Sequence, residues 1–115
     1  MPETQCSVRY QASTMTAPLK QLISDYGEYL ELLSACEKLH LLSVLAFWQG
    51  LDTELQETTE ENEIYTLAEA IEDYAADLPG DVLAALNCLE GIEVGAVLDL
   101  MVAISNQLRE GVYQK

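Results

Sequence analysis

Apolar residues recur every three or four positions along most of this chain, which is the spacing of one face of an α-helix. The first such pattern covers 19–33 and follows Pro18, a residue typical of the first helical turn. Gly27 lies inside this pattern and should weaken the helix without ending it. Residues 1–15 are small and polar, so we expect a flexible N-terminal segment there. A single helical domain is then predicted over 16–115.

The second helical pattern is the most apolar part of the chain. Ser34 and Glu37 form a capping-box pattern, in which each side chain accepts a hydrogen bond from a free backbone N–H. Residues 39–48 are apolar on nearly every side, so this helix is expected at the centre of the core. Gly50 is expected to end it.

The second half of the chain predicts three more helices. Residues 51–62 form an acidic linker, and Thr58 with Glu61 predicts the cap of the third helix. A Pro-Gly break at 79–80 separates that helix from a short fourth one, which should stop near Gly91. The positions expected to face inward in the three helices are Ile64, Leu67, Ala68, Ile71, Ala75, Leu78, Val82, Leu83, Leu86, Leu89, Val94, Val97, Leu98, Met101, Ile104 and Leu108.

These patterns predict an all-α fold, a small bundle of about five helices, because strand-like alternation is nearly absent. The tripeptide Val-Leu-Ala occurs at 44–46 and again at 82–84, each time before a glycine stop. Two helix pairs related by duplication would explain this repeat, and coincidence explains it equally well.

The cysteines and the termini bear on the compartment. Cys6, Cys36 and Cys88 are an odd number at wide spacing, without a metal-binding motif. The last two fall in apolar helical patterns, so we expect them to be buried in a reducing compartment. Neither a signal peptide nor an apolar run long enough to cross a membrane is visible, and the chain is predicted to be cytoplasmic.

Charge changes this picture of an ordinary helical domain. The net charge is −15 over 115 residues, and between Leu39 and Leu108 there are 14 Asp or Glu and no Lys or Arg. Such a field repels nucleic acid and membranes and attracts basic protein surfaces. A solvated surface that keeps an apolar protein soluble is the plain alternative. The missing ion-pair partners favour a binding role, because the repulsion is left uncompensated within the block.

The densest acidic part is predicted to be the partner-binding surface. Rows of carboxylates on helices have the charge character of duplex DNA, which carries about one charge per 1.7 Å of axis. They would make charge-assisted pairs with Arg and Lys of a partner. The candidate residues are Asp52, Glu54, Glu57, Glu60, Glu61, Glu63, Glu69, Glu72, Asp73 and Asp77.

The stretch Leu67-Ala-Glu-Ala-Ile-Glu-Asp-Tyr74, with the residues that follow it, resembles the middle helical part of ArdA antirestriction proteins. The segment Ile23-Ser-Asp-Tyr-Gly-Glu-Tyr29 is similar to the acidic lead-in of that region. The resemblance implies an elongated DNA mimic that occupies the DNA-binding groove of type I restriction-modification enzymes. This chain is shorter than the family and lacks its N-terminal sheet and C-terminal part, so a homodimer is left open. The apolar segment 34–50 is also similar to part of the helical domain of orange carotenoid proteins.

Two other function classes were weighed against an acidic binding protein. A helical adaptor would bind through an apolar helix face, such as that of Leu98, Met101 and Leu108. A metal-dependent nucleotide hydrolase would need two facing acidic clusters around a cavity. The acids of the third helix should instead face water, opposite its apolar stripe, and the later acids form no compact second cluster.

The remaining candidate chemistry is expected to be structural. His40, the single histidine, has no nucleophile and acid tied to it by local pattern. The aromatic residues Tyr26, Tyr29, Tyr65, Tyr74 and Trp48 are expected to pack in or beside the core rather than line a ligand pocket. We therefore predict a protein that is not an enzyme, with no cofactor and no metal.

Overall fold

The computed structural model describes residues 5–12, 14–58, 64–74 and 77–114. Its secondary structure there is helical, with one isolated parallel bridge between Ser34 and Gln114. The helices are α2 (Val8–Gln11), α3 (Ala17–Tyr26), α4 (Ala35–Thr58), α5 (Leu67–Asp73), α6 (Gly80–Cys88) and α7 (Val94–Glu110). The predicted all-α bundle is confirmed. No helix in these residues is both long and apolar enough to cross a membrane.

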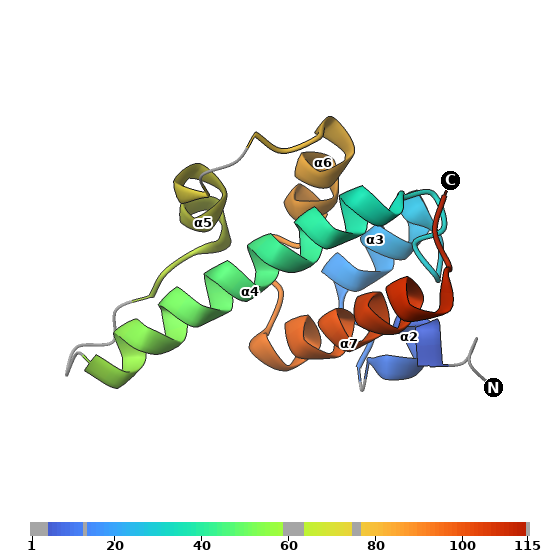
Figure 1. The fold of residues 1–115 in the computed structure, drawn as a ribbon. Helices are drawn as coiled ribbons and strands as arrows, with labels where there is room; N and C mark the ends of the chain where they lie inside the picture. Colours follow the sequence, from blue (N-terminus) through green and yellow to red (C-terminus); the bar gives the residue numbers. More distant parts are fainter. Residues whose placement is uncertain (1–4, 13, 59–63, 75–76, 115) are drawn as a thin grey trace.

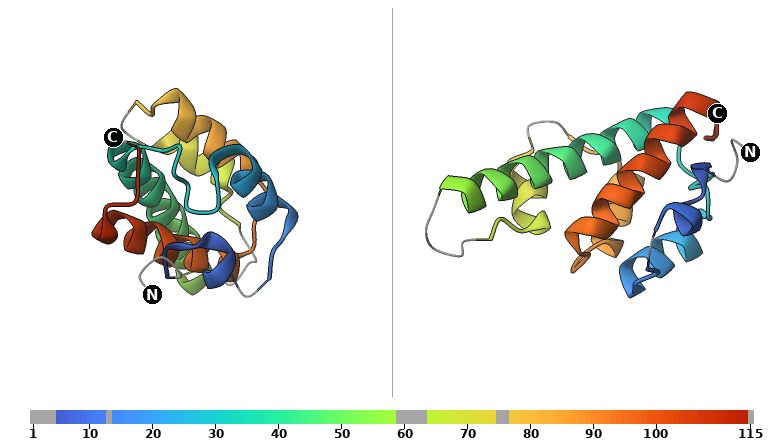
Figure 2. Two further views of the ribbon diagram at one scale, coloured as in Figure 1. Left: turned by 90° about the vertical axis from the view of Figure 1, so that its right-hand side faces the viewer. Right: turned by 90° about the horizontal axis from the view of Figure 1, so that it is seen from below.

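Helix α4 is the central element of the bundle (Figure 1). It packs against α5, α6 and α7, while α2 packs on α7 and α3 on α6. Seen from below, α7 crosses α4, and α2 and α3 lie on the other side of α7 (Figure 2). Leu41, Val44 and Leu45 of α4 are fully buried, which confirms the expected position of 39–48 in the core.

The start of α4 follows the predicted capping box. The Ser34 N–H donates to Glu37 Oε1 at 2.8 Å, and the Glu37 N–H donates to Ser34 Oγ at 3.1 Å. Two backbone donors that the helix leaves free are thus satisfied reciprocally. Because both partners lie within four residues, this cap could be predicted from the sequence.

The predicted end of α4 at Gly50 is wrong, because the helix continues to Thr58. A glycine inside a helix costs about 1 kcal/mol relative to alanine. Contacts beyond it outweigh that cost, since Leu51 and Leu55 are half-buried and Asp52 is buried. Eight of the twelve residues of the predicted acidic linker, 51–58, are therefore helical, and 59–62 lie outside the described residues.

The cap of α5 also differs from the prediction. Thr58 belongs to α4 and donates from Oγ1 to the Glu54 carbonyl, and Glu61 lies outside the described residues. The cap is Thr66, whose Oγ1 accepts from the Glu69 N–H at 3.2 Å and donates to Glu69 Oε1 at 3.0 Å. The same Thr-x-x-Glu pattern recurs eight residues later, and only the packing of the chain decides which copy starts the helix.

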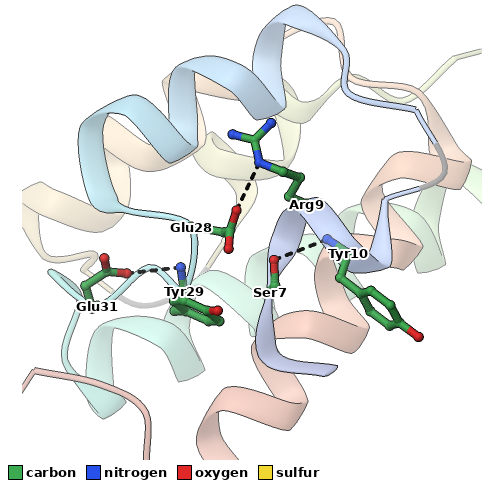
Figure 3. Close-up of polar contacts among 6 residues, drawn as sticks. All are labelled: Ser7, Arg9, Tyr10, Glu28, Tyr29 and Glu31. Carbon is green, nitrogen blue, oxygen red and sulfur yellow. Dashed lines mark hydrogen bonds and ion pairs between the residues drawn. The ribbon is translucent and has the colours of Figure 1, made fainter. Parts of the chain in front are cut away.

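Helix α3 ends at Gly27 rather than running to Leu33 as predicted. Gly27 has a φ of +96°, in the left-handed region that favours glycine. The loop that follows places Leu30 and Leu33 in the core, fully buried. Glu31 folds back inside this loop and accepts a hydrogen bond from the Tyr29 N–H (Figure 3).

Substitution of Gly27 by alanine is expected to lower the free energy of unfolding by about 1–2 kcal/mol. The new methyl group would occupy a strained backbone position and meet the Glu31 carboxyl group. Urea unfolding followed by circular dichroism measures the loss. Gly50→Ala is the control, because a Cβ at Gly50 meets no neighbour and alanine favours the helix, so stability should rise.

The N-terminal segment is predicted to be flexible, but its described residues pack on the bundle. Cys6 and Val8 are fully buried, and the Val8 N–H donates to the Glu28 carbonyl at 3.0 Å. Arg9 Nε lies 2.9 Å from Glu28 Oε1, and Ser7 Oγ caps α2 by accepting a hydrogen bond from the Tyr10 N–H (Figure 3). One helical turn is thereby docked between α7 and the loop after α3.

The burial of the cysteines differs from the expectation. Cys36 is exposed and Cys88 is half-buried, while Cys6 is the buried one, and none of the three forms a disulfide within the described part of the chain. Burial and a hydrogen bond to Asp25 Oδ2 raise the pKa of the Cys88 thiol. The apolar pattern around Cys36 misled the prediction, because the first turn of α4 turns this position toward solvent.

Lys38 is the most unusual residue of the core. It is fully buried, and its Nζ donates to the Tyr29 carbonyl at 3.0 Å, to Gln107 Oε1 at 2.9 Å and to the Val112 carbonyl. The three donors of an ammonium group are thus all used. Gln107 is also buried and donates from Nε2 to the Cys6 carbonyl at 2.7 Å. This pair connects both ends of the chain to α4 and α7.

The buried face of α7 is rotated from the predicted stripe. Val97 and Ile104 are buried as expected, together with Leu100, Ala103 and Gln107. Val94 and Leu98, which the pattern predicts to face inward, are instead 49% and 51% exposed. Val102, one turn further along α7, is 47% exposed. We call these three residues the α7 ridge. Ile64 and Leu83, also predicted to face inward, are exposed.

The two Val-Leu-Ala tripeptides occupy unlike positions. Val44 and Val82 are both fully buried, but Leu45 is fully buried and Leu83 is 37% exposed. Their helices have 24 and 9 residues. The positions therefore give no support to duplication as the origin of the repeat.

Candidate functional site

Six of the predicted acidic residues lie on one projecting part of the molecule, which we call the acidic arm: Asp52, Glu54, Glu57, Glu69, Glu72 and Asp73. It consists of the last turns of α4 (51–58) and the returning segment with α5 (64–74). In Figure 1 the C-terminal end of α4 extends to the lower left, beyond α6 and α7. The molecule measures 44 × 31 × 23 Å.

Tyr65 connects the two halves of the arm through its backbone. Its carbonyl accepts from Trp48 Nε1 at 2.8 Å, and its N–H donates to Asp52 Oδ1 at 3.0 Å. Trp48 and Asp52 are one helical turn apart on α4, so they lie on the same face. The second Asp52 oxygen accepts from Gln56 Nε2 at 3.1 Å. The peptide groups of a non-helical segment are thereby satisfied although they are buried.

The side chain of Tyr65 extends the connection to α5. Its hydroxyl donates to Asp73 Oδ2 at 2.6 Å. Burial, and then the hydrogen bond to Asp73, raise the pKa of Tyr65 to about 12. The tyrosine therefore stays neutral over the physiological range and keeps donating to this carboxylate. Tyr65 and Trp48 were expected only to pack, and the one signal for this role is that buried Tyr and Trp need polar partners.

The ten predicted site residues have different surroundings in the structure. Asp52 is 7% exposed with both oxygens used inside the protein, so its assignment to the partner-binding surface does not fit. The exposed members of the set are Glu54, Glu57, Glu69, Glu72, Asp73 and Asp77. Glu60, Glu61 and Glu63 lie outside the described residues.

The exposed carboxylates of the arm have little compensation from the protein's own cations. Lys38 is buried in the core, and the ion pairs among the described residues join Arg9 to Glu28 and Arg109 to Glu110. Glu28, whose ion pair Figure 3 shows, and Glu110 are thus paired, whereas the exposed carboxylates of the arm take part in no ion pair among the described residues. A basic ligand would gain the most at the arm.

A groove runs along one side of the arm, and no pattern in the sequence predicts it. We call it the α4 groove; it has a volume of about 630 Å³. Buried Trp48, Leu67 and Ile92 form its floor, and exposed Ile64 and Val94 form its edge. A smaller hollow of about 300 Å³, which Tyr65 also lines, is formed with Leu51, Glu54, Leu55 and Thr58. Apolar side chains therefore lie between the carboxylates of the acidic arm.

Two features bear on catalytic chemistry. Cys36 and His40 are one turn apart on α4 and line a surface hollow with Leu39, Ser43 and Tyr74. A nucleophile and its base need hydrogen-bond contact, and none joins these two described side chains. Within the described part of the chain, no three His, Cys, Asp or Glu side chains gather as metal ligands. The acidic arm is therefore the strongest candidate for a functional site within the described part of the chain.

Comparisons with protein-family models, with curated proteins and with solved structures find no match for this chain. The resemblance of residues 22–105 to ArdA antirestriction proteins stays a prediction from the residues.

Proposed function

We propose that this protein is a non-enzymatic binding protein whose acidic arm occupies a basic site on another protein. In its most specific form it is a DNA mimic that inhibits a DNA-binding enzyme. The observation that supports this best is the set of exposed carboxylates on α4 and α5, which have no cationic partner among the residues that the structure describes. They would stand in for phosphates and pair with Arg and Lys of the partner.

The first experiment is competition with DNA. Fluorescently labelled duplex is bound to a set of DNA-binding enzymes that includes a type I restriction enzyme, and the protein is added at about 50 and 200 mM salt. We expect displacement of the duplex that weakens steeply as salt rises, because the contacts are charge pairs. If no enzyme releases its DNA, or if release ignores ionic strength, DNA mimicry is excluded for that set.

Charge reversal on α5 is expected to weaken binding at least tenfold and to flatten the salt dependence. The double variant Glu69→Lys/Glu72→Lys places repulsion where the partner presents cations. The control Asp25→Lys/Glu110→Lys changes the net charge equally but lies on α3 and α7, outside the arm. Binding constants from fluorescence anisotropy should separate the two variants, because charges beyond the Debye length of about 8 Å are screened.

The exposed α7 ridge favours a second candidate function, a helical adaptor. Val94, Leu98 and Val102 form one row on a helix that, between 94 and 108, carries only the charged residue Asp99. Such a row packs against another helix. It replaces the face of Leu98, Met101 and Leu108 predicted from the sequence, since Met101 and Leu108 are half-buried. If the protein is an adaptor, Leu98→Asp should abolish binding of its partner. The double variant Glu69→Lys/Glu72→Lys should hardly change that binding.

A further inference from the structure

The α4 groove is an apolar surface inside a strongly acidic region. Its edge residues Ile64 and Val94 are 73% and 49% exposed, while Trp48, Leu67 and Ile92 beneath them are 6–8% exposed. An isoleucine with this exposure beside a groove favours a role of the surface in binding over a role in solubility. The groove is open to solvent and large enough for several side chains of a ligand.

The charge around the groove limits what can occupy it. Glu90 and Glu93 line the groove and are exposed, and no Lys or Arg occurs between Leu39 and Leu108. A second copy of the chain would bring another net charge of −15 to this surface. A wholly apolar ligand would gain nothing from the negative charge around the groove. An occupant with Lys and Arg beside its apolar residues satisfies both features.

Backbone hydrogen bonding indicates the conformation of the occupant. A peptide that binds as an added β-strand needs a free sheet edge for its backbone groups. The described residues contain only the isolated bridge at Ser34 and Gln114, and neither residue lines the groove. A helix satisfies its own backbone and presents an apolar row.

We propose that the α4 groove binds a basic amphipathic helix of the partner protein, with the apolar row of that helix between Ile64 and Val94. The Lys and Arg on either side of the row pair with Glu90, Glu93 and the acids of the arm. This rests on the proposed function, because it assigns the partner's basic site a helical form. It also explains why the acidic arm is apolar between its charges.

Trp48 is the single tryptophan and lies in the floor of the groove, so its fluorescence reports occupancy. The probe is a tryptophan-free peptide of about 18 residues made of Leu and Lys, with Leu at helical spacing of three and four. A permuted peptide of the same composition and an oligolysine of the same charge are the references. We expect a shift of Trp48 emission only with the amphipathic peptide, and binding at least tenfold tighter than that of the permuted peptide.

Paired variants locate the binding surface. Ile64→Asn/Val94→Asn leaves the charge unchanged and should weaken the amphipathic peptide about tenfold while leaving oligolysine binding unchanged. Leu32→Asn/Leu39→Asn removes two leucines that are each 54% exposed outside the groove and should have no such effect. Circular dichroism confirms that both variants fold.

The outcomes separate this proposal from the proposed function. Salt-dependent oligolysine binding with equal affinity for amphipathic and permuted peptides overturns the groove proposal alone. A wild-type dimer in sedimentation that Ile64→Asn/Val94→Asn dissociates also overturns it, because the occupant would be a second copy. If neither oligolysine nor the amphipathic peptide binds at low salt, the proposed function fails as well.

Discussion

Replacement of Lys38 by methionine is expected to lower the free energy of unfolding by about 2 kcal/mol or more at pH 7. Methionine fills a similar volume but leaves the carbonyls of Tyr29 and Val112 and the Gln107 side-chain oxygen without their donor. Each buried acceptor left unsatisfied costs about 1–3 kcal/mol, and removing a buried charge offsets part of the total. Urea unfolding of the two proteins measures the difference. Lys20→Met is the control, because Lys20 is exposed.

The same variant should change the pH dependence of stability. Burial lowers the pKa of Lys38 from 10.5 to about 8, against the opposing influence of Glu31 and Cys6. Between these values the unfolded chain binds the proton and the folded protein releases it. The penalty of the buried charge is therefore fully present below pH 8 and disappears as the pH rises toward 10.5. Wild-type stability should gain up to ~1.4 kcal/mol per pH unit from this residue in that window.

The comparison with Lys38→Met at each pH isolates this contribution. The raised pKa of Cys88 acts in the opposite direction above about pH 9, and it is present in both proteins. We expect the stability difference between wild type and variant to grow from pH 8 to pH 10. A difference that stays constant across this range would mean that Lys38 titrates as it does in the unfolded chain.

Substitution of Asp52 by alanine is expected to destabilise the protein by about 2–3 kcal/mol, mainly by releasing the acidic arm. The buried Tyr65 N–H and the Gln56 amide would lose their acceptor. A buried donor left unpaired costs about 1–3 kcal/mol, and more where its partner was charged. Tyr65 would then hold Trp48 less firmly, so the Trp48 emission should shift to the red before global unfolding.

Glu54→Ala is the matched control for Asp52→Ala. It removes one negative charge two residues away on the same helix, but Glu54 is exposed. Its effect should stay within about 0.5 kcal/mol, because exposed substitutions away from specific contacts are nearly neutral. Equal effects of the two substitutions would show that net charge, and not the hydrogen bonds of Asp52, determines stability here.

Local patterns in the sequence predicted those elements whose hydrogen bonds are local. The Ser34–Glu37 cap joins residues three apart, and the short helix α6 follows its Pro-Gly break directly. The apolar composition of 39–48 was enough to predict the central helix. Helix ends were predicted less well, because the pattern predicts that the helix continues through Gly27 and that the next one ends at Gly50, and both predictions are wrong. Gly27 has a positive φ and ends α3, whereas Gly50 is helical and its neighbours are held by the core.

The candidate site was predicted in outline but not in its parts. The acidic composition correctly indicated exposed carboxylates at Glu54, Glu57, Glu69 and Glu72. It could not distinguish Asp52 from them, because a buried structural aspartate and an exposed one are the same letter. The groove beside Tyr65 needs Trp48, Ile64 and Val94 to meet, and no local pattern connects these three positions.

The all-α class, the central helix and the concentration of negative charge between Leu39 and Leu108 all follow from the order of the residues along the chain. That Asp52 bonds to Tyr65, 13 residues away, and Lys38 to Gln107, 69 residues away, follows only from the way the chain packs. The difference lies in the range of the interactions. Periodicity and caps depend on neighbours within one helical turn, while the burial of a charged group depends on which distant segments supply its hydrogen bonds.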